Sequence, residues 1–189
     1  RALLTGRGAY MDDLPVKTGT VHAAVLRSPY AHAEIVSIDT SACLARSDVV
    51  AVITGQDMLR YTDNFKLAFD TPMDYRGLAV DRVRFIGEPI AVVCASSRYR
   101  AEDALDEIKV EYRPLPAVMD PVEALAEDAT VIHPKIGSNL YSRHVFKHGD
   151  PAPAFVAAER TIAFTMRYPR NSIPPIECFA CVAEYLPET

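Results

Sequence analysis

Unbroken hydrophobic runs mark two segments of the chain. Residues 49–53 and 90–95 are entirely apolar, which is the pattern of strands that are covered on both faces. Residues 20–26 and 32–39 also predict strands, because they are rich in Val, Ile and Ala, and residues 27–30 between them contain Ser-Pro, which favours a turn. The first half of the chain is therefore predicted to contain a sheet.

Helical spacing is clearest in residues 97–109. Apolar residues recur there three and four positions apart and acidic residues lie between them; the apolar ones are Ala101, Ala104, Leu105 and Ile108. Ser97, the first residue of this segment, can serve as its N-cap. A second, short helix is predicted at residues 121–125, with Asp120 as its cap and a proline at its first position. Strands and helices together predict a mixed α and β structure.

The pattern changes after residue 125. Residues 126–149 show no sustained periodicity, which predicts a linker. Residues 160–167 and 176–185 are then predicted as strands, but two strands alone do not bury their own faces. The sequence thus predicts one domain over residues 1–125, a linker over 126–149, and the start of an incomplete second domain over 150–189.

Composition and charge exclude several classes of protein. The chain has 189 residues, of which 49% are hydrophobic, so a disordered chain is excluded. Its formal net charge is −5 and its basic residues form no cluster, which argues against nucleic-acid binding. No apolar run approaches the roughly 20 residues that span a bilayer. Four cysteines without a disulfide framework and no signal-peptide pattern predict reduced thiols and a cytoplasmic location.

Few residues show the spacing of known catalytic motifs. The chain has no P-loop, no G-x-S-x-G and no H-E-x-x-H sequence. His144 and His148 have the spacing that places two imidazoles on one face of a helix, with Asp150 nearby, and would suit a metal. They fall in the predicted linker, however, so we favour solvated loop histidines over a metal site.

The predicted strand at residues 176–185 holds three candidate residues. Cys178 and Cys181 form a C-x-x-C pair, but residues three apart on a strand point to opposite faces, so we expect two core thiols rather than a disulfide or a zinc site. Glu177 shares a face with apolar residues, where a carboxylate must be paired, hydrogen-bonded or protonated. It is a candidate functional residue, and a structural ion pair would explain the same pattern.

Several longer strings resemble one known family in collinear order along nearly the whole chain. They are LLTGRGAYMDDL at 3–14, LRSPYAHA at 26–33, AVITG at 51–55, VRFIGEPIAVV at 83–93, AEDAL at 101–105 and VEYRPLP at 110–116. Together they are similar to the opening of the large, molybdenum-binding subunit of the xanthine dehydrogenase, aldehyde oxidase and carbon monoxide dehydrogenase family.

The resemblance implies a fold and a chemistry. The fold class is α+β: an α/β hammerhead domain followed by the first strands of a molybdopterin-binding domain. Members of the family hydroxylate an aldehyde, an N-heterocycle or a similar carbon centre with oxygen from water. The molybdenum is held by molybdopterin, which we expect as the cytosine dinucleotide, and electrons leave through [2Fe-2S] clusters to FAD on partner subunits or domains.

The resemblance also implies which residues of this chain approach the cofactor. Asn171 falls near the position where many members have a glutamine that faces the metal, and Glu177 lies where a strand of the family begins near the cofactor. The glycine-rich loop and the catalytic glutamate of the family lie in the remainder of the large subunit, so no catalytic residue is expected in this segment.

Two hypotheses follow for the function. In the first, the chain is part of a molybdenum hydroxylase, inactive alone, whose partners are the remainder of the molybdenum subunit, an iron–sulfur subunit and a FAD subunit. Its substrate would then be a small molecule. In the alternative, the chain is a non-catalytic assembly module that only binds partner subunits.

Overall fold

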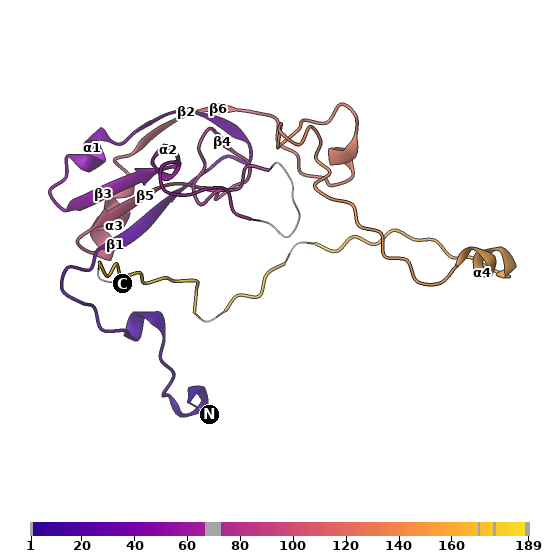
Figure 1. Cartoon of the computed structure of the whole chain (residues 1–189), viewed down its shortest axis with the longest axis horizontal. Coiled ribbons are helices and arrows are strands. Elements are labelled where there is room, and N and C mark those ends of the chain that lie inside the picture. Colours follow the sequence, from indigo (N-terminus) through magenta and orange to yellow (C-terminus); the bar gives the residue numbers. More distant parts are fainter. Residues whose placement is uncertain (1, 67–72, 170, 176, 188–189) are drawn as a thin grey trace. The chain divides into compact units, whose positions relative to one another are not determined.

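The chain forms two compact units. The computed structural model describes residues 2–66, 73–169, 171–175 and 177–187 (Figure 1). Unit 1 comprises residues 1–18 and 146–189, and unit 2 comprises residues 19–145. Unit 2 contains all the described strands and α1 to α3, whereas α4 lies in unit 1.

The first sheet of unit 2 contains the two unbroken apolar runs. Its order is β1 (His22–Arg27), β5 (Pro89–Ala95) and β3 (Val49–Thr54), and both pairings are antiparallel. The predicted strands at residues 20–26, 49–53 and 90–95 are therefore confirmed. The hydrophobic residues of β5 do not alternate with polar ones because both faces of this strand are covered. Ala91 and Val93 pack with Cys43 and Ala104 on one face, and Ile90 packs with Ala33 and Val83 on the other.

The second sheet is more polar than the first. Its order is β4 (Arg82–Val83), β2 (Ala33–Asp39) and β6 (Lys109–Pro114), again antiparallel. The strand predicted at residues 32–39 is confirmed as β2. Neither β4, which has two residues, nor β6 was predicted. In β6 (KVEYRP), Val110 and Tyr112 alternate with charged residues and are half-buried against the core clusters. Both β4 and β6 are strands because β2 supplies their hydrogen-bonding partner.

The predicted long helix is confirmed as α3 (Arg98–Leu105). It packs against β1, β5 and β3 through its buried residues Ala101 and Ala104. The Oγ of Ser97 accepts a hydrogen bond from the backbone N–H of Arg100 at 3.4 Å, as expected of an N-cap. The helix is shorter than predicted because the chain turns after Leu105 and enters β6 at Lys109.

Two short helices of unit 2 were not predicted. They are α1 (Ser41–Leu44) and α2 (Gly55–Met58), and both lie against β3. A four-residue helix is too short for a 3.6-residue period to be visible in the sequence.

The core of unit 2 consists of small and β-branched residues. One cluster joins the first sheet to α1 and α3 and contains Cys43, Ala91, Val93, Ala104 and Ile108. Another cluster lies where the two sheets meet and contains Ala33, Ala79, Val83 and Ile90. Cys43 is fully buried in the hydrophobic core, and burial raises the pKa of its thiol.

The chain after β6 continues within unit 2. The short helix predicted at residues 121–125 is a 3₁₀ turn, η3 (Glu123–Leu125), and Asp120 Oδ1 accepts from the N–H of Val122 at 2.7 Å. Residues 126–145 form neither helix nor strand, as expected of the predicted linker, although they belong to unit 2. The predicted domain limits at residues 125 and 149 stay a prediction.

Unit 1 differs most from the predictions. Its elements are η1 (Leu3–Thr5), η2 (Met11–Asp13) and α4 (Ala152–Ala157). The described residues of 160–167 and 176–185 form no strand, so that prediction is wrong for them; Ile176 lies outside the described residues. Alternating hydrophobic residues become a strand only beside a hydrogen-bonded neighbour, and the described part of unit 1 provides none. Across the described residues, no helix has the length and apolar character needed to cross a membrane.

Candidate functional site

The two residues assigned to the cofactor by resemblance lie in unit 1, and both are exposed. The side-chain amide of Asn171 donates from Nδ2 to the hydroxyl oxygen of Tyr168 at 2.6 Å. The carboxylate of Glu177 accepts through Oε1 from the backbone N–H of Met11, also at 2.6 Å. Each residue thus has its own hydrogen-bond partner.

Glu177 connects the two sequence segments of unit 1. Its partner Met11 begins η2, a turn that is closed by a hydrogen bond from the N–H of Tyr10 to Asp13 Oδ2 at 2.9 Å. A second connection joins Lys17 Nζ to Glu184 Oε2 at 2.6 Å. Glu177 was expected to be paired, hydrogen-bonded or protonated, and it is hydrogen-bonded. The prediction that it shares a face with apolar residues is wrong, because its side chain is exposed.

The cysteine pair also departs from the prediction. Cys178 and Cys181 are free thiols, but both are exposed rather than buried in a core. The expectation rested on a strand at residues 176–185, and without that strand the two side chains have no sheet face to pack on. Among the described residues, no three His, Cys, Asp or Glu side chains gather to suit a metal ion, His144 and His148 included.

The described residues do not form a molybdenum site by themselves. Asn171 and Glu177 are exposed, and the amide of Asn171 already donates to Tyr168. A buried metal cofactor needs converging donors that are shielded from water. The roles assigned to Asn171 and Glu177 consequently stay a prediction.

A turn of unit 2 lies within the VRFIGEPIAVV string. We call residues 85–89 the GEP turn. Gly87 has φ +85°, a conformation that favours glycine. Its N–H donates to Ser28 O at 2.8 Å, the N–H of Ser28 donates to Glu88 O at 2.9 Å, and Arg27 Nη1 donates to Gly87 O at 2.9 Å. The turn is therefore held from both sides by the end of β1 and the residue that follows it.

Glu88 is the half-buried carboxyl group of this turn. Its Oε2 accepts a hydrogen bond from the backbone N–H of Arg84. Burial raises the pKa of Glu88, because desolvation disfavours the charged form more than the Arg84 N–H and guanidinium favour it. The tip of the turn is apolar and faces outward, with Phe85 49% and Ile86 68% exposed.

Unit 2 also contains a pocket of about 460 Å³, which is lined by Met73 and by residues of the chain after β6. Its walls are mostly apolar and include Val118, Ile132 and Ile136. Asn139 builds one wall: its Oδ1 accepts from the N–H of Ile132 at 2.9 Å, and its Nδ2 donates to Ala124 O at 3.0 Å and Thr130 O at 2.9 Å. One amide thereby organises the irregular segment around the pocket.

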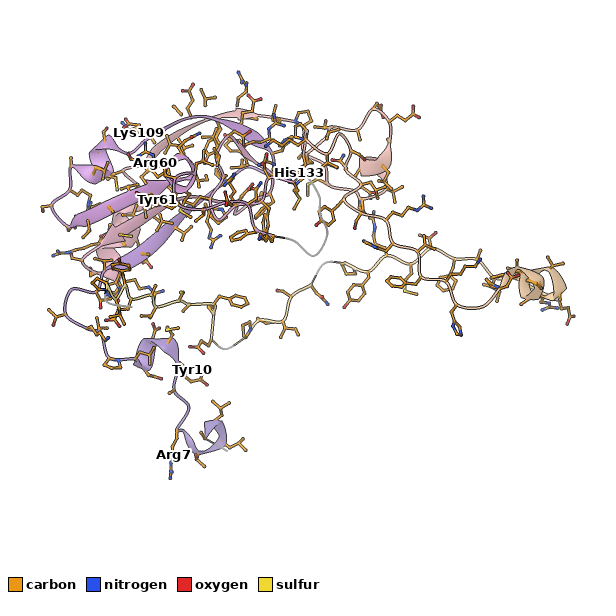
Figure 2. All side chains as sticks on the ribbon, in the orientation of Figure 1. Arg7, Tyr10, Arg60, Tyr61, Lys109 and His133 are labelled. Carbon is orange, nitrogen blue, oxygen red and sulfur yellow. The ribbon has the colours of Figure 1, made fainter. Side chains whose placement is uncertain are left out.

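His133, which is labelled in Figure 2, gives the mostly apolar pocket a polar edge. Burial lowers the pKa of His133, and the positive charge of Arg84 lowers it further, while Asp74 opposes both. Asp74 itself pairs with Lys135 Nζ at 2.8 Å, and this hydrogen bond lowers the pKa of Asp74. At neutral pH the edge therefore presents an uncharged imidazole beside an ion pair.

Sequence reasoning missed His133 and Asn139. Both lie in the segment that was interpreted as a linker because it lacks periodicity. A usable signal was present: single polar residues stand among Ile132, Ile136 and Leu140, and such residues are commonly hydrogen-bonded within irregular structure.

Comparison with known proteins agrees with the fold of unit 2. Residues 5–116 match the family of the aldehyde oxidase and xanthine dehydrogenase a/b hammerhead domain. The nicotine 6-hydroxylase large subunit of Paenarthrobacter nicotinovorans is 36% identical over 187 residues, which cover 97% of this chain and 23% of that subunit. The chain therefore spans about a quarter of the length of this relative.

Solved structures give the same result. The crystal structure of quinoline 2-oxidoreductase from Pseudomonas putida 86 is 40% identical with a TM-score of 0.72, over 84% of this chain and 20% of that one. The Cu,Mo-CO dehydrogenase is 37% identical with a TM-score of 0.61, over 68% of this chain and 16% of that one. The predicted α+β hammerhead fold is confirmed, and the chain belongs to the aldehyde oxidase and xanthine dehydrogenase family, whose a/b hammerhead domain it carries.

Proposed function

We propose that this chain is a segment of the large subunit of a molybdenum hydroxylase that oxidises a small organic molecule. The observation that carries the proposal is the similarity to the nicotine 6-hydroxylase large subunit, which extends over 97% of the chain and thus beyond the hammerhead domain. The reaction would hydroxylate an aldehyde, an N-heterocycle or a similar carbon centre with oxygen from water. Two relatives are named for N-heterocycles, nicotine and quinoline, which supports that substrate class.

The proposal includes a cofactor and partners outside this chain. Molybdopterin, as the cytosine dinucleotide, would supply the redox chemistry when bound, and [2Fe-2S] clusters and FAD on partner subunits would carry the electrons. The remainder of the molybdenum subunit would complete the site, since the chain spans 23% of its nicotine-hydroxylating relative. A cytoplasmic location fits the four free cysteines.

Within the complete subunit, we assign Asn171 and Glu177 to the edge of the cofactor site. The exposed amide of Asn171 offers a second N–H beyond the one that Tyr168 accepts. Glu177 would orient the chain through Met11 rather than touch the substrate, because its described contact is with a backbone N–H. Both assignments rest on the resemblance and on the exposure of the two side chains.

One observation favours the alternative, a non-catalytic assembly module. The GEP turn is fixed by three hydrogen bonds with Arg27 and Ser28, and it presents Phe85 and Ile86 to solvent. A rigid, exposed apolar tip is the kind of feature that anchors a protein–protein interface. In that case the hammerhead unit would bind partner subunits without contributing to the reaction.

The experiment compares the 189-residue chain with a large subunit that contains it and is assembled with its iron–sulfur and FAD partners. Molybdenum is measured by elemental analysis, and turnover by reduction of a dye with an aldehyde or an N-heterocycle. We expect no stoichiometric molybdenum and no turnover for the isolated chain, and both for the assembly. One equivalent of metal with turnover from the chain alone would contradict the segment interpretation, and an assembly without metal would favour the alternative.

Variants in the assembled enzyme separate the two hypotheses further. Asn171→Ala and Glu177→Gln should lower molybdenum content or turnover at least tenfold if they border the cofactor, as outer partners of metal sites commonly do. Glu159→Gln, which changes an exposed carboxylate of the same unit, is the matched control. Equal activity for all three variants would remove Asn171 and Glu177 from the site.

A further inference from the structure

Within the described part of unit 2, three buried polar side-chain atoms have no hydrogen-bond partner: His32 Nε2, Arg84 Nε and His133 Nδ1. The His32 residue is only 2% exposed and the Arg84 side chain 10%. Native structures seldom leave such atoms unpaired, because each one loses its hydrogen bonds to water without replacement. Three of them in one unit therefore need an explanation.

The sheet register places two of these residues opposite each other. In the antiparallel pair of β2 and β4, Ala33 faces Val83 and Glu34 faces Arg82. One residue beyond this ladder the same register sets His32 opposite Arg84. Side chains of directly opposed residues lie on the same face of a sheet and within reach of each other.

The third residue belongs to the same neighbourhood. The charge of Arg84 acts on the imidazole of His133, and His32 and Asp74 act on it as well. His133 comes from the irregular segment after β6, whereas His32 directly precedes β2 and Arg84 directly follows β4. Three parts of the chain that are distant in sequence therefore contribute a residue to this neighbourhood.

The unpaired nitrogens of His32 and Arg84 differ in kind: one is a hydrogen-bond acceptor and the other is a donor. His32 Nδ1 lies 2.8 Å from Pro116 O, which only accepts, so Nδ1 carries the proton. In the neutral ring, Nε2 of His32 is then an acceptor that needs a donor. Arg84 Nε–H is always a donor that needs an acceptor.

We propose that an internal water molecule occupies this region and bridges the three side chains. Its oxygen accepts from Arg84 Nε–H, and its two protons are donated to His32 Nε2 and His133 Nδ1. The molecule then makes three hydrogen bonds, the usual number for a buried water. His133 takes part as the neutral tautomer with its proton on Nε2.

Water fits these atoms better than an ion does. A chloride ion has no proton to donate to His32 Nε2, and a metal cation would meet the guanidinium of Arg84. The carboxylates that surround Arg84 also disfavour an anion: Asp81 Oδ1 lies 3.7 Å from Arg84 Nη2, and Glu88 accepts from the backbone N–H of Arg84. Asp74 is already bound to Lys135.

The bridge has a structural consequence for the pocket. His133 lines the pocket, and residues 126–145 have no strand or helix to hold them to the sheet. A water that joins His133 to His32 and Arg84 attaches this segment to the ends of β2 and β4. The position of the pocket wall then depends on a hydrogen bond that a neutral His133 accepts.

The test uses the complete 189-residue chain in a high-resolution crystal structure and in long-range ¹H–¹⁵N spectra of its histidines. We expect one water within hydrogen-bond distance of all three atoms, His32 protonated on Nδ1, and His133 protonated on Nε2. Anomalous scattering from bromide-soaked crystals distinguishes a halide. An empty region, a halide, a direct bond between the side chains, or separate waters that each contact one atom would overturn the proposal.

Variants provide a second readout. His133→Phe removes one acceptor and should lower the occupancy of the water by at least half while His32 keeps its tautomer. His148→Phe, which changes an exposed histidine of unit 1, should leave the water and both tautomers unchanged. A His133→Phe chain with the water undisturbed would show that His133 is not part of the bridge.

Discussion

A Cβ placed on Gly55 would lie 2.0 Å from the carbonyl oxygen of Ala79, well inside the closest approach of two such atoms. Gly55 is the first residue of α2, and it follows β3 directly. Ala79 is fixed on its other side, because its N–H donates to Pro89 O at 2.8 Å. The start of α2 thus packs backbone to backbone against the segment that leads into β4.

Gly55→Ala should therefore destabilise unit 2, although alanine is the better helix former. Neither backbone can move without breaking strand contacts, so we expect a loss of about 3 kcal/mol in the free energy of unfolding, as for overpacked cores. Urea denaturation measures it. Gly77→Ala is the control, because its nearest atoms are the ends of two flexible side chains at 3.9 Å. Equal midpoints for the two variants would contradict the close approach.

The cap of α2 gives a second prediction. Asp57 Oδ2 accepts from the N–H of Thr54 at 2.9 Å and from its hydroxyl at 2.7 Å, and these bonds lower the pKa of Asp57. Asp57→Ala should cost about 1 kcal/mol at pH 7, the usual value of a capping interaction.

The pH dependence of this loss follows from the lowered pKa. The stabilisation by the ionised carboxylate is complete above the unfolded pKa of 3.8 and is lost as pH falls through the lower folded value. The difference between wild type and Asp57→Ala, measured by denaturation, should then shrink in acid. Asp63→Ala, an exposed aspartate, serves as the control. A difference that stays constant down to pH 2 would show that the carboxylate charge is not involved.

His133 makes the stability of the chain depend on pH in a higher pH range than Asp57 does. Its folded pKa lies below the ordinary value of 6.5, chiefly because of burial. Below pH 6.5 the unfolded chain then binds more protons than the folded chain, so stability falls as the solution is acidified. We expect a lower urea midpoint at pH 5.5 than at pH 7.5 for wild type.

A His133→Phe variant should flatten this dependence, since it removes the group that the unfolded state protonates. His148→Phe should retain the wild-type dependence and controls for the loss of a histidine elsewhere. If His133→Phe keeps the full wild-type slope between pH 7.5 and 5.5, another group is responsible.

The hydrophobic pattern of the sequence predicted the helices and strands that pack on the core. It missed the strands that form because a neighbouring strand pairs with them. The strands β1, β2, β3 and β5 and helix α3 each carry an apolar face or run, and each was predicted. By contrast, β6 has only Val110 and Tyr112 as apolar residues between charged ones, and its pairing with β2 makes it a strand. The strands predicted at residues 160–167 and 176–185 failed for the converse reason, since alternation without a pairing strand does not make a sheet.

The sites differ in the same way. Asn171 and Glu177 were assigned by the order of residue strings alone, and the structure adds their partners Tyr168 and Met11. The convergence of His32, Arg84 and His133 was not predictable from the sequence. It requires the register of β2 against β4 and the path of the chain after β6, and neither leaves a local signal.

The last prediction concerns the limits of the hammerhead domain, which we place at residues 1–125, followed by a linker at 126–149. Arg143 and Lys147 are exposed and lie outside helices and strands, whereas Arg98 and Arg100 lie in α3, whose buried face packs on the first sheet. A protease needs an extended substrate, so cleavage in α3 requires unfolding and cleavage in the linker does not.

Limited trypsin digestion followed by mass spectrometry should therefore cut after Arg143 or Lys147 before it cuts within residues 97–109. The double variant Arg143→Gln with Lys147→Gln should delay the linker cut severalfold and leave the rate of cleavage in α3 unchanged, which separates the local effect from a change in global stability. Early cleavage after Arg98 or Arg100 would mean that α3 opens before the linker is reached. The domain assignment would then have to be withdrawn, because the helix that covers the first sheet would not belong to a stable unit.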